Sequence, residues 1–164
     1  MKQKVIHGVT TEKQFYWSDY KLCGGSERTL TKYNNNSSYG TVDTLTTLEQ
    51  VDDAAYQSDN TCRMPTKAEL EELRTNTTST WETLNGVDGM RFTSKTNGNS
   101  IFVPPAGACY GGSVNGVGSG GYLWSSSLDE SDSRFAWYLR FNSSSVNMGS
   151  YNRYDGLTVR AVKE

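Results

Sequence analysis

The sequence predicts an α+β fold, with two short helices in the first half of the chain and antiparallel strands in the second half. Three observations predict it. Residues 47–75 place apolar side chains at helical spacing, residues 80–107 form short strand-like runs separated by tight-turn dipeptides, and residues 135–162 alternate apolar with polar side chains. A chain of 164 residues has the length of one domain with its own core, so residues 1–164 are expected to fold as a single unit.

The composition is polar and nearly neutral. Only 35% of the residues are apolar, while Ser, Thr, Asn, Gly and Tyr are abundant, as in loop-rich β proteins and polar binding domains. A net charge of −2 without a run of Lys or Arg argues against a nucleic-acid partner, and no apolar run is long enough for direct membrane insertion. The cysteines, Cys23, Cys62 and Cys109, are expected to be buried or half-buried free thiols, with one disulfide as the alternative in an exported chain.

The first half of the chain should hold a short strand at residues 5–9, an aromatic segment at 15–20 that packs, and both helices. Residues 47–57 have acidic side chains early, where the helix dipole favours them, and predict the first helix. The side chains expected on its buried side are Leu48, Val51 and Ala55, with Tyr56 as a further candidate. The second helix is expected from Lys67 to Thr75. It begins with a capping box made by Thr66 and Glu69 and buries a stripe made by Leu70 and Leu73.

The middle of the chain reads as an antiparallel meander. Strands are expected at residues 80–84, 89–96 and 99–107, because the Asn-Gly and Asp-Gly pairs between them supply the positive φ angles of tight hairpin turns. The glycine-rich segment from Gly107 is expected to be a surface loop between strands. Its GxGxxG pattern is not followed by a helical period, so a dinucleotide site is not expected there.

The last forty residues alternate like half-buried strands. Strands are expected at residues 135–141, 145–149 and 157–162. The side chains expected on their apolar face are Trp137, Leu139, Phe141, Val146, Met148, Leu157, Val159 and Ala161. Ala136, Tyr138 and Arg140 should point the opposite way.

The chain lacks the residue sets that common enzymes need. His7 is the only histidine, so neither a Ser-His-Asp triad nor a zinc cluster is expected. The two carboxylates of a glycosidase would have to come from Asp129, Glu130, Asp132 and Asp155, but their sequence context shows no apolar surroundings that would raise a pKa. The LDESDS segment lacks the glycine and final glutamate of an EF-hand loop. The sequence therefore predicts a protein that is not an enzyme and holds no cofactor or metal.

Taken together, the motifs of residues 17–164 resemble those of the Fibrobacter succinogenes major paralogous domain. The matching segments include WSDYKLC, RMPT, AELEELR, GGYLWSSSLDES, WYLRFNSSSV and NRYDGLTVRAV. The family is abundant in gut Bacteroides and is similar to the C-type lectin fold. The resemblance implies two short helices and a twisted antiparallel sheet. It also implies an extracellular, cell-surface or virion location, although residues 1–14 carry no export signal.

Some members of this family are variable proteins of diversity-generating retroelements, and residues 122–164 resemble their variable region. In that pattern a constant framework would include Trp124, Trp137, Leu139, Arg153 and Val159. The diversified, ligand-binding positions implied by the resemblance are Ser133, Arg134, Phe135, Tyr138, Arg140, Asn142, Asn147, Gly149, Ser150, Tyr151, Asn152, Tyr154 and Asp155.

The composition of the same region independently suggests recognition. Tyr offers a large rigid contact area at low entropic cost, and Ser, Gly and Asn offer adaptable hydrogen bonding, as in antibody loops. The same residues also decorate exposed sheet faces that bind nothing. The leading hypothesis is a non-enzymatic recognition or adhesion domain for a protein or glycan on a cell surface. The alternative is a structural module of a bacterial surface or phage-tail assembly without a diversified site.

Overall fold

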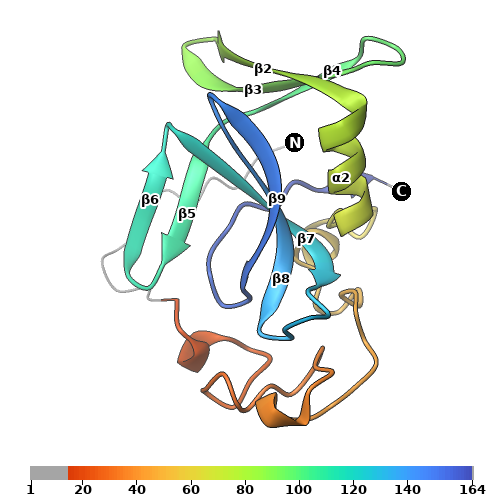
Figure 1. The fold of residues 1–164 in the computed structure, drawn as a ribbon, viewed down its shortest axis with the longest axis vertical. Coiled ribbons are helices and arrows are strands. Elements are labelled where there is room, and N and C mark those ends of the chain that lie inside the picture. The colour runs from red at the N-terminus through yellow and green to blue at the C-terminus, as the bar shows by residue number, and fades with distance from the viewer. Residues whose placement is uncertain (1–14, 164) are drawn as a thin grey trace.

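The chain folds as an α+β protein with two α-helices and mostly antiparallel strands, shown by a computed structural model that describes residues 15–163 (Figure 1). The strand expected at residues 5–9 lies outside the described residues. The helices are α1 (Ala54–Ser58) and α2 (Lys67–Asn76). The strands are β1 (Cys62–Arg63), β2 (Thr77–Leu84), β3 (Val87–Ser94), β4 (Ser100–Val103), β5 (Ala106–Tyr110), β6 (Ser113–Val117), β7 (Gly120–Leu128), β8 (Phe135–Asn142), β9 (Ser145–Asn152) and β10 (Val162–Lys163).

The described strands form four antiparallel sheets. A three-stranded sheet of β7, β8 and β9 lies at the centre, and a second one of β2, β3 and β4 lies above it (Figure 1). The β5–β6 hairpin stands on one side of the central sheet and α2 on the other (Figure 1). β1 pairs with β10 near the C-terminus.

The main core fills the space between the central sheet, α2 and the β2–β3–β4 sheet. Leu139 of β8 is fully buried, and Leu70 of α2 and Phe92 of β3 pack in the same cluster. The rings of Phe92 and Phe141 meet edge to face, with centroids 5.8 Å apart. Val146 and Met148 of β9 pack against this cluster, so the expected apolar face of β8 and β9 is confirmed.

Helix α2 begins as its sequence predicts. The Thr66 hydroxyl accepts a hydrogen bond from the Glu69 amide, and the Glu69 carboxylate accepts one from the Thr66 amide at 2.8 Å. Arg63 also donates two hydrogen bonds to the Glu69 carboxylate, and together these donors lower the pKa of Glu69 to about 2. The capping box is therefore confirmed and is tied to β1 as well.

The first helix is shorter than expected. It occupies only residues 54–58, because Asp53 caps it: the Asp53 carboxylate accepts hydrogen bonds from the amides of Ala55 and Tyr56. The same carboxylate accepts a third bond from the Met64 amide. Ala55 is buried as expected, but Val51 precedes the helix and is 60% exposed, so its predicted burial is wrong.

Two expectations for the second half are wrong. The segment from Gly107 is not a surface loop, because it forms strands β5 and β6 and the start of β7. Gly107 and Gly116 have positive φ angles there, and a Cβ on Gly107 would lie 2.4 Å from the carbonyl oxygen of Asn115. Residues 157–162 are not a continuous strand, since only Thr158 bridges to Leu123 before β10 begins at Val162. The three cysteines are half-buried free thiols, as expected.

Candidate binding face

The register of β8 and β9 gathers alternate predicted site residues on one face of the central sheet. Arg140 lies opposite Asn147, and Tyr138 lies opposite Gly149. Because side chains alternate along a strand, the predicted positions that share this face are Tyr138, Arg140, Asn142, Asn147, Gly149 and Tyr151. The opposite face carries the main core. We call this surface the tyrosine face and include in it Tyr122 of β7 and the neighbouring Tyr110 of β5.

Aromatic rings cover the middle of the tyrosine face. The ring centroids of Tyr110 and Tyr151 are 5.2 Å apart, those of Tyr138 and Tyr151 are 6.4 Å apart, and those of Tyr122 and Tyr138 are 6.1 Å apart. Gly149 makes room for this layer, since a Cβ there would lie 3.1 Å from the Tyr138 ring. The rings thus form one contiguous layer built from four strands.

The residues of this face differ in solvent exposure, and Tyr138 is the inner member of the layer. Tyr151 is 40% exposed, and Arg140 and Asn147 are exposed beside it. Tyr138 is only 8% exposed, because Trp124 packs edge to face against it at 6.0 Å. Tyr138 lies on the face that the strand period predicts, but its side chain lies beneath the surface instead of on it.

Burial keeps the phenols of Tyr110 and Tyr138 protonated at neutral pH. Burial raises the pKa of Tyr110 well above its ordinary value, and the neighbouring Tyr122 and Tyr151 raise it further. Burial also raises the pKa of Tyr138, whose hydroxyl is hydrogen-bonded to Arg140. These two hydroxyl groups are therefore neutral and can both donate and accept hydrogen bonds.

Asp155 is a buried carboxylate close enough to Tyr110 to raise the pKa of that phenol. It is 6% exposed, and its Oδ2 has no hydrogen-bond partner among residues 15–163. Burial raises the pKa of its carboxyl group to about 6, in spite of a hydrogen bond with Asn152. The expectation that this carboxylate lacks surroundings that raise its pKa is therefore wrong, and its burial does not fit the ligand-binding position implied for it.

Ser133 and Arg134 tie the β7–β8 turn to the N-terminal loops. Ser133 is fully buried and donates a hydrogen bond to Asn35, so its expected surface position is wrong. Arg134 forms ion pairs with Asp132 at 2.7 Å and with Glu27 at 3.1 Å. Its hydrogen bonds to Asp132 hold the pKa of that carboxyl group below its ordinary value. These contacts stabilise the turn and occupy the groups that a ligand would use.

The other predicted positions lie apart from the tyrosine face. Phe135 is half-buried next to Arg134, and Ser150 lies on the opposite face of β9, where it hydrogen-bonds Asp129. Asn152 is half-buried, and Tyr154 packs edge to face on Trp17 at 5.0 Å.

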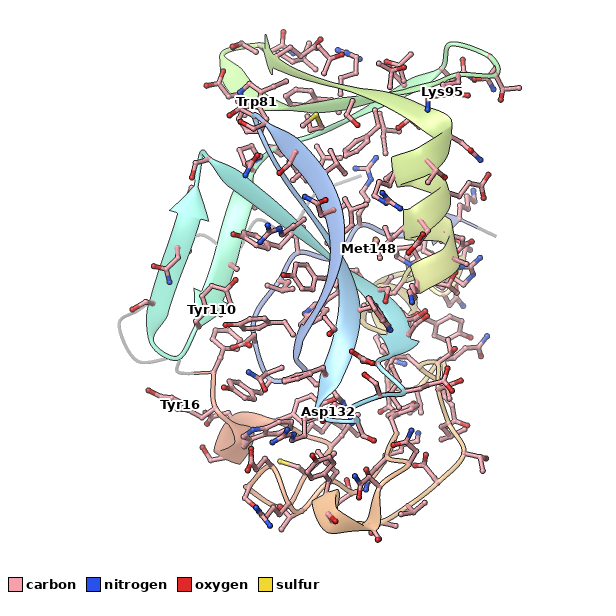
Figure 2. The ribbon with its side chains drawn as sticks, in the orientation of Figure 1. Tyr16, Trp81, Lys95, Tyr110, Asp132 and Met148 are labelled. Carbon is pink, nitrogen blue, oxygen red and sulfur yellow. The ribbon has the colours of Figure 1, made fainter. Side chains whose placement is uncertain are left out.

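Two tyrosines near this surface, half-buried Tyr110 and exposed Tyr16, were not predicted. Tyr110 ends β5, inside the segment that was expected to be a loop, and Tyr16 is 47% exposed (Figure 2). The hydroxyl of Tyr16 lies next to Gly111, which follows Tyr110 in the chain. No local pattern connects these residues with β9, because the contact depends on how the β5–β6 hairpin docks beside the central sheet.

Comparison of the chain with protein-family models, with curated proteins and with solved structures finds no match. Within residues 15–163, no cluster of three or more His, Cys, Asp or Glu side chains is arranged to hold a metal ion. None of the helices described is long and apolar enough to span a bilayer.

Proposed function

We propose that the protein is a non-enzymatic recognition domain and that the tyrosine face binds a protein or glycan on a cell surface. The observation that carries this proposal is the contiguous layer formed by Tyr110, Tyr122, Tyr138 and Tyr151, with exposed Arg140 and Asn147 at its edge. Binding surfaces commonly concentrate their energy in rigid Tyr and Arg side chains surrounded by adaptable polar groups.

The two faces of the central sheet differ in their contacts, and this difference supports the proposed binding function. Leu139, Phe141 and Met148 hold β8 and β9 against the main core, while Arg140, Asn147 and Tyr151 on the other face are exposed. A rigid backbone with exposed side chains lowers the entropic cost of ligand binding. The proposal includes a C-type-lectin-like fold of the Fibrobacter succinogenes major paralogous domain type, and a cell-surface or virion location.

A binding screen against glycan arrays and bacterial cells tests the proposal. The variant Arg140→Ala, Asn147→Ala, Tyr151→Ala removes exposed groups only and should weaken binding to any identified ligand at least about tenfold. A matched control replaces exposed residues elsewhere, with Asn60→Ala, Val87→Ala and Arg160→Ala. Equal binding by the wild type and the tyrosine-face variant would contradict the proposal.

The diversified-region part of the proposal has its own test in the neighbouring DNA. A reverse transcriptase gene and a near-identical template repeat, differing at adenines across codons 130 to 156, are expected near the coding sequence. A genome without that repeat would remove the diversification and leave a recognition domain of fixed sequence.

The β6 edge favours a second candidate function, a structural module of a surface or phage-tail assembly. Every residue of β6 is exposed, and Val114 and Val117 are 42% and 66% exposed. β6 pairs only with β5 within the described part of the chain, so its other edge is open to a strand of another molecule. Light scattering distinguishes the two functions: a stable oligomer that Val117→Lys dissociates supports assembly, and a monomer supports recognition.

A further inference from the structure

A cavity of about 350 Å³ lies between the N-terminal loops and the central sheet. Its walls are mainly apolar and include Leu48, Met64, Trp124, Leu128 and Val159. None of the exposed residues of the tyrosine face lines it. Pockets of this size that are mostly apolar and hold a few polar groups are typical of small-molecule sites.

Arg153 supplies a buried positive charge to this cavity. It is only 9% exposed and lines the cavity wall. Its guanidinium donates to the hydroxyl of Tyr20 and to the backbone carbonyls of Lys32, Tyr33 and Ser133, at 2.9 to 3.1 Å. All four acceptors are neutral, and within residues 15–163 no carboxylate pairs with this arginine. A buried charge without a counter-ion is energetically costly, so the site favours an anion.

Arg153 and Tyr20 each keep a hydrogen-bond donor that no described residue accepts. The Nη2 atom of Arg153 carries two hydrogens and donates one of them, to the Lys32 carbonyl. The Tyr20 hydroxyl accepts from Arg153 at 3.1 Å, and its own hydrogen has no acceptor among the described residues. Burial raises the pKa of Tyr20, so this hydroxyl keeps its proton. The second hydrogen of Arg153 Nη2 and the hydroxyl hydrogen of Tyr20 are therefore both left to donate, and both residues line the cavity.

The carboxylate that lines the cavity does not neutralise this charge. Asp52 accepts hydrogen bonds from Lys32 at 2.6 Å and from the Tyr33 hydroxyl at 2.8 Å, and Lys21 lies 3.8 Å away. Lys21 also lines the cavity, and its side chain is 78% exposed. The charged residues of the lining are thus Lys21, Asp52 and Arg153, which leaves an excess of positive charge.

We propose that this cavity binds a small carboxylic acid with an apolar body, whose carboxylate accepts hydrogen bonds from Arg153 and Tyr20 and whose body packs against Leu48 and Trp124. The cavity is too small for more than a small molecule or one large side chain. This site is separate from the tyrosine face and does not depend on the function proposed for that face.

A titration of the full chain with three matched compounds tests this proposal. The probes are 3-phenylpropionate, its amide and 3-phenylpropylamine, followed at neutral pH through the backbone amide NMR signals of Leu48, Ser126 and Val159. The carboxylate should shift these signals saturably. The amide should bind at least about tenfold more weakly, because it lacks the charge that pairs with Arg153.

Two conservative variants locate the site. Tyr20→Phe keeps the ring and removes the hydroxyl, so it should weaken carboxylate binding about tenfold. Tyr56→Phe makes the same change at a half-buried tyrosine outside the cavity lining and should leave binding unchanged. Any of three results overturns the proposal. They are a 3-phenylpropionate titration without a saturable shift, 3-phenylpropylamine that binds as tightly as 3-phenylpropionate, and a Tyr20→Phe variant that binds 3-phenylpropionate as tightly as the wild type does.

Discussion

Replacing Asp155 by Asn should make the protein more stable at neutral pH, because this carboxyl group is costly to ionise where it lies. The side chain is 6% exposed, and its Oδ2 has no partner among residues 15–163. Asn has nearly the same shape and carries no charge. The hydrogen bond from the Trp124 indole to the backbone carbonyl of residue 155 does not involve the side chain and is retained.

The magnitude follows from the pKa of Asp155, which is about 6 in the folded protein and 3.8 ordinarily. Each pKa unit corresponds to about 1.4 kcal/mol, so ionisation of this group costs the folded state about 3 kcal/mol above pH 7. The folded-state pKa is the higher one. The folded state therefore binds the proton more tightly, and stability falls as the pH rises from about 4 to above 6.

Urea unfolding of the wild type and of Asp155→Asn, at about pH 4 and about pH 7.5, measures this effect. The variant should gain about 2 kcal/mol or more relative to the wild type between the two pH values. Asp132→Asn is the control with the opposite sign, because hydrogen bonds from Arg134 lower the pKa of Asp132. The stability that Asp132 contributes is complete above its ordinary pKa of 3.8 and is lost only as the pH falls below about 4, so that variant should not gain stability relative to the wild type between the two pH values. A stability difference between Asp155→Asn and the wild type that does not change with pH would refute the reasoning.

Three further changes test the packing and the cap by thermal or urea unfolding. Gly121→Ala should destabilise the protein by about 3 kcal/mol or more, since its Cβ would lie 2.0 Å from the Phe141 ring; a loss below 1 kcal/mol would contradict this. Leu139→Ala should cost about 3 to 5 kcal/mol, because Leu139 is fully buried; an equal melting temperature would contradict it. Thr66→Ala should cost about 1 kcal/mol through loss of the hydrogen bond to Glu69, and an unchanged stability would show that the cap contributes nothing.

The elements that the sequence predicts well are those whose determinants are local. Helix α2 carries its start signal in Thr66 and Glu69, which are three residues apart, and the structure shows both hydrogen bonds. In β8 the alternation of Leu139 and Phe141 with Tyr138 follows from the strand period alone. Such patterns specify a side chain's face, and they do so without knowledge of the rest of the fold.

The features that the sequence does not predict depend on contacts between distant segments. Whether Tyr138 is exposed depends on packing by Trp124, and the burial of Ser133 depends on Asn35, 98 residues away in the sequence. The cavity beside Arg153 is of the same kind, since the carbonyls that hold this arginine come from residues at least 20 positions away. The two-residue period of a strand predicts which face of the sheet a side chain lies on, but it does not predict which other segments cover that face.

The difference between outer and inner residues of the tyrosine face determines which positions can vary. Arg140 and Asn147 are exposed, so substitutions there are expected to change stability by about 0.5 kcal/mol or less. Tyr138 is buried against Trp124, and its replacement would leave a cavity beneath the layer. A surface that changes its ligand by substitution can therefore do so at the outer positions, while Tyr138 is expected to stay aromatic because it supports them.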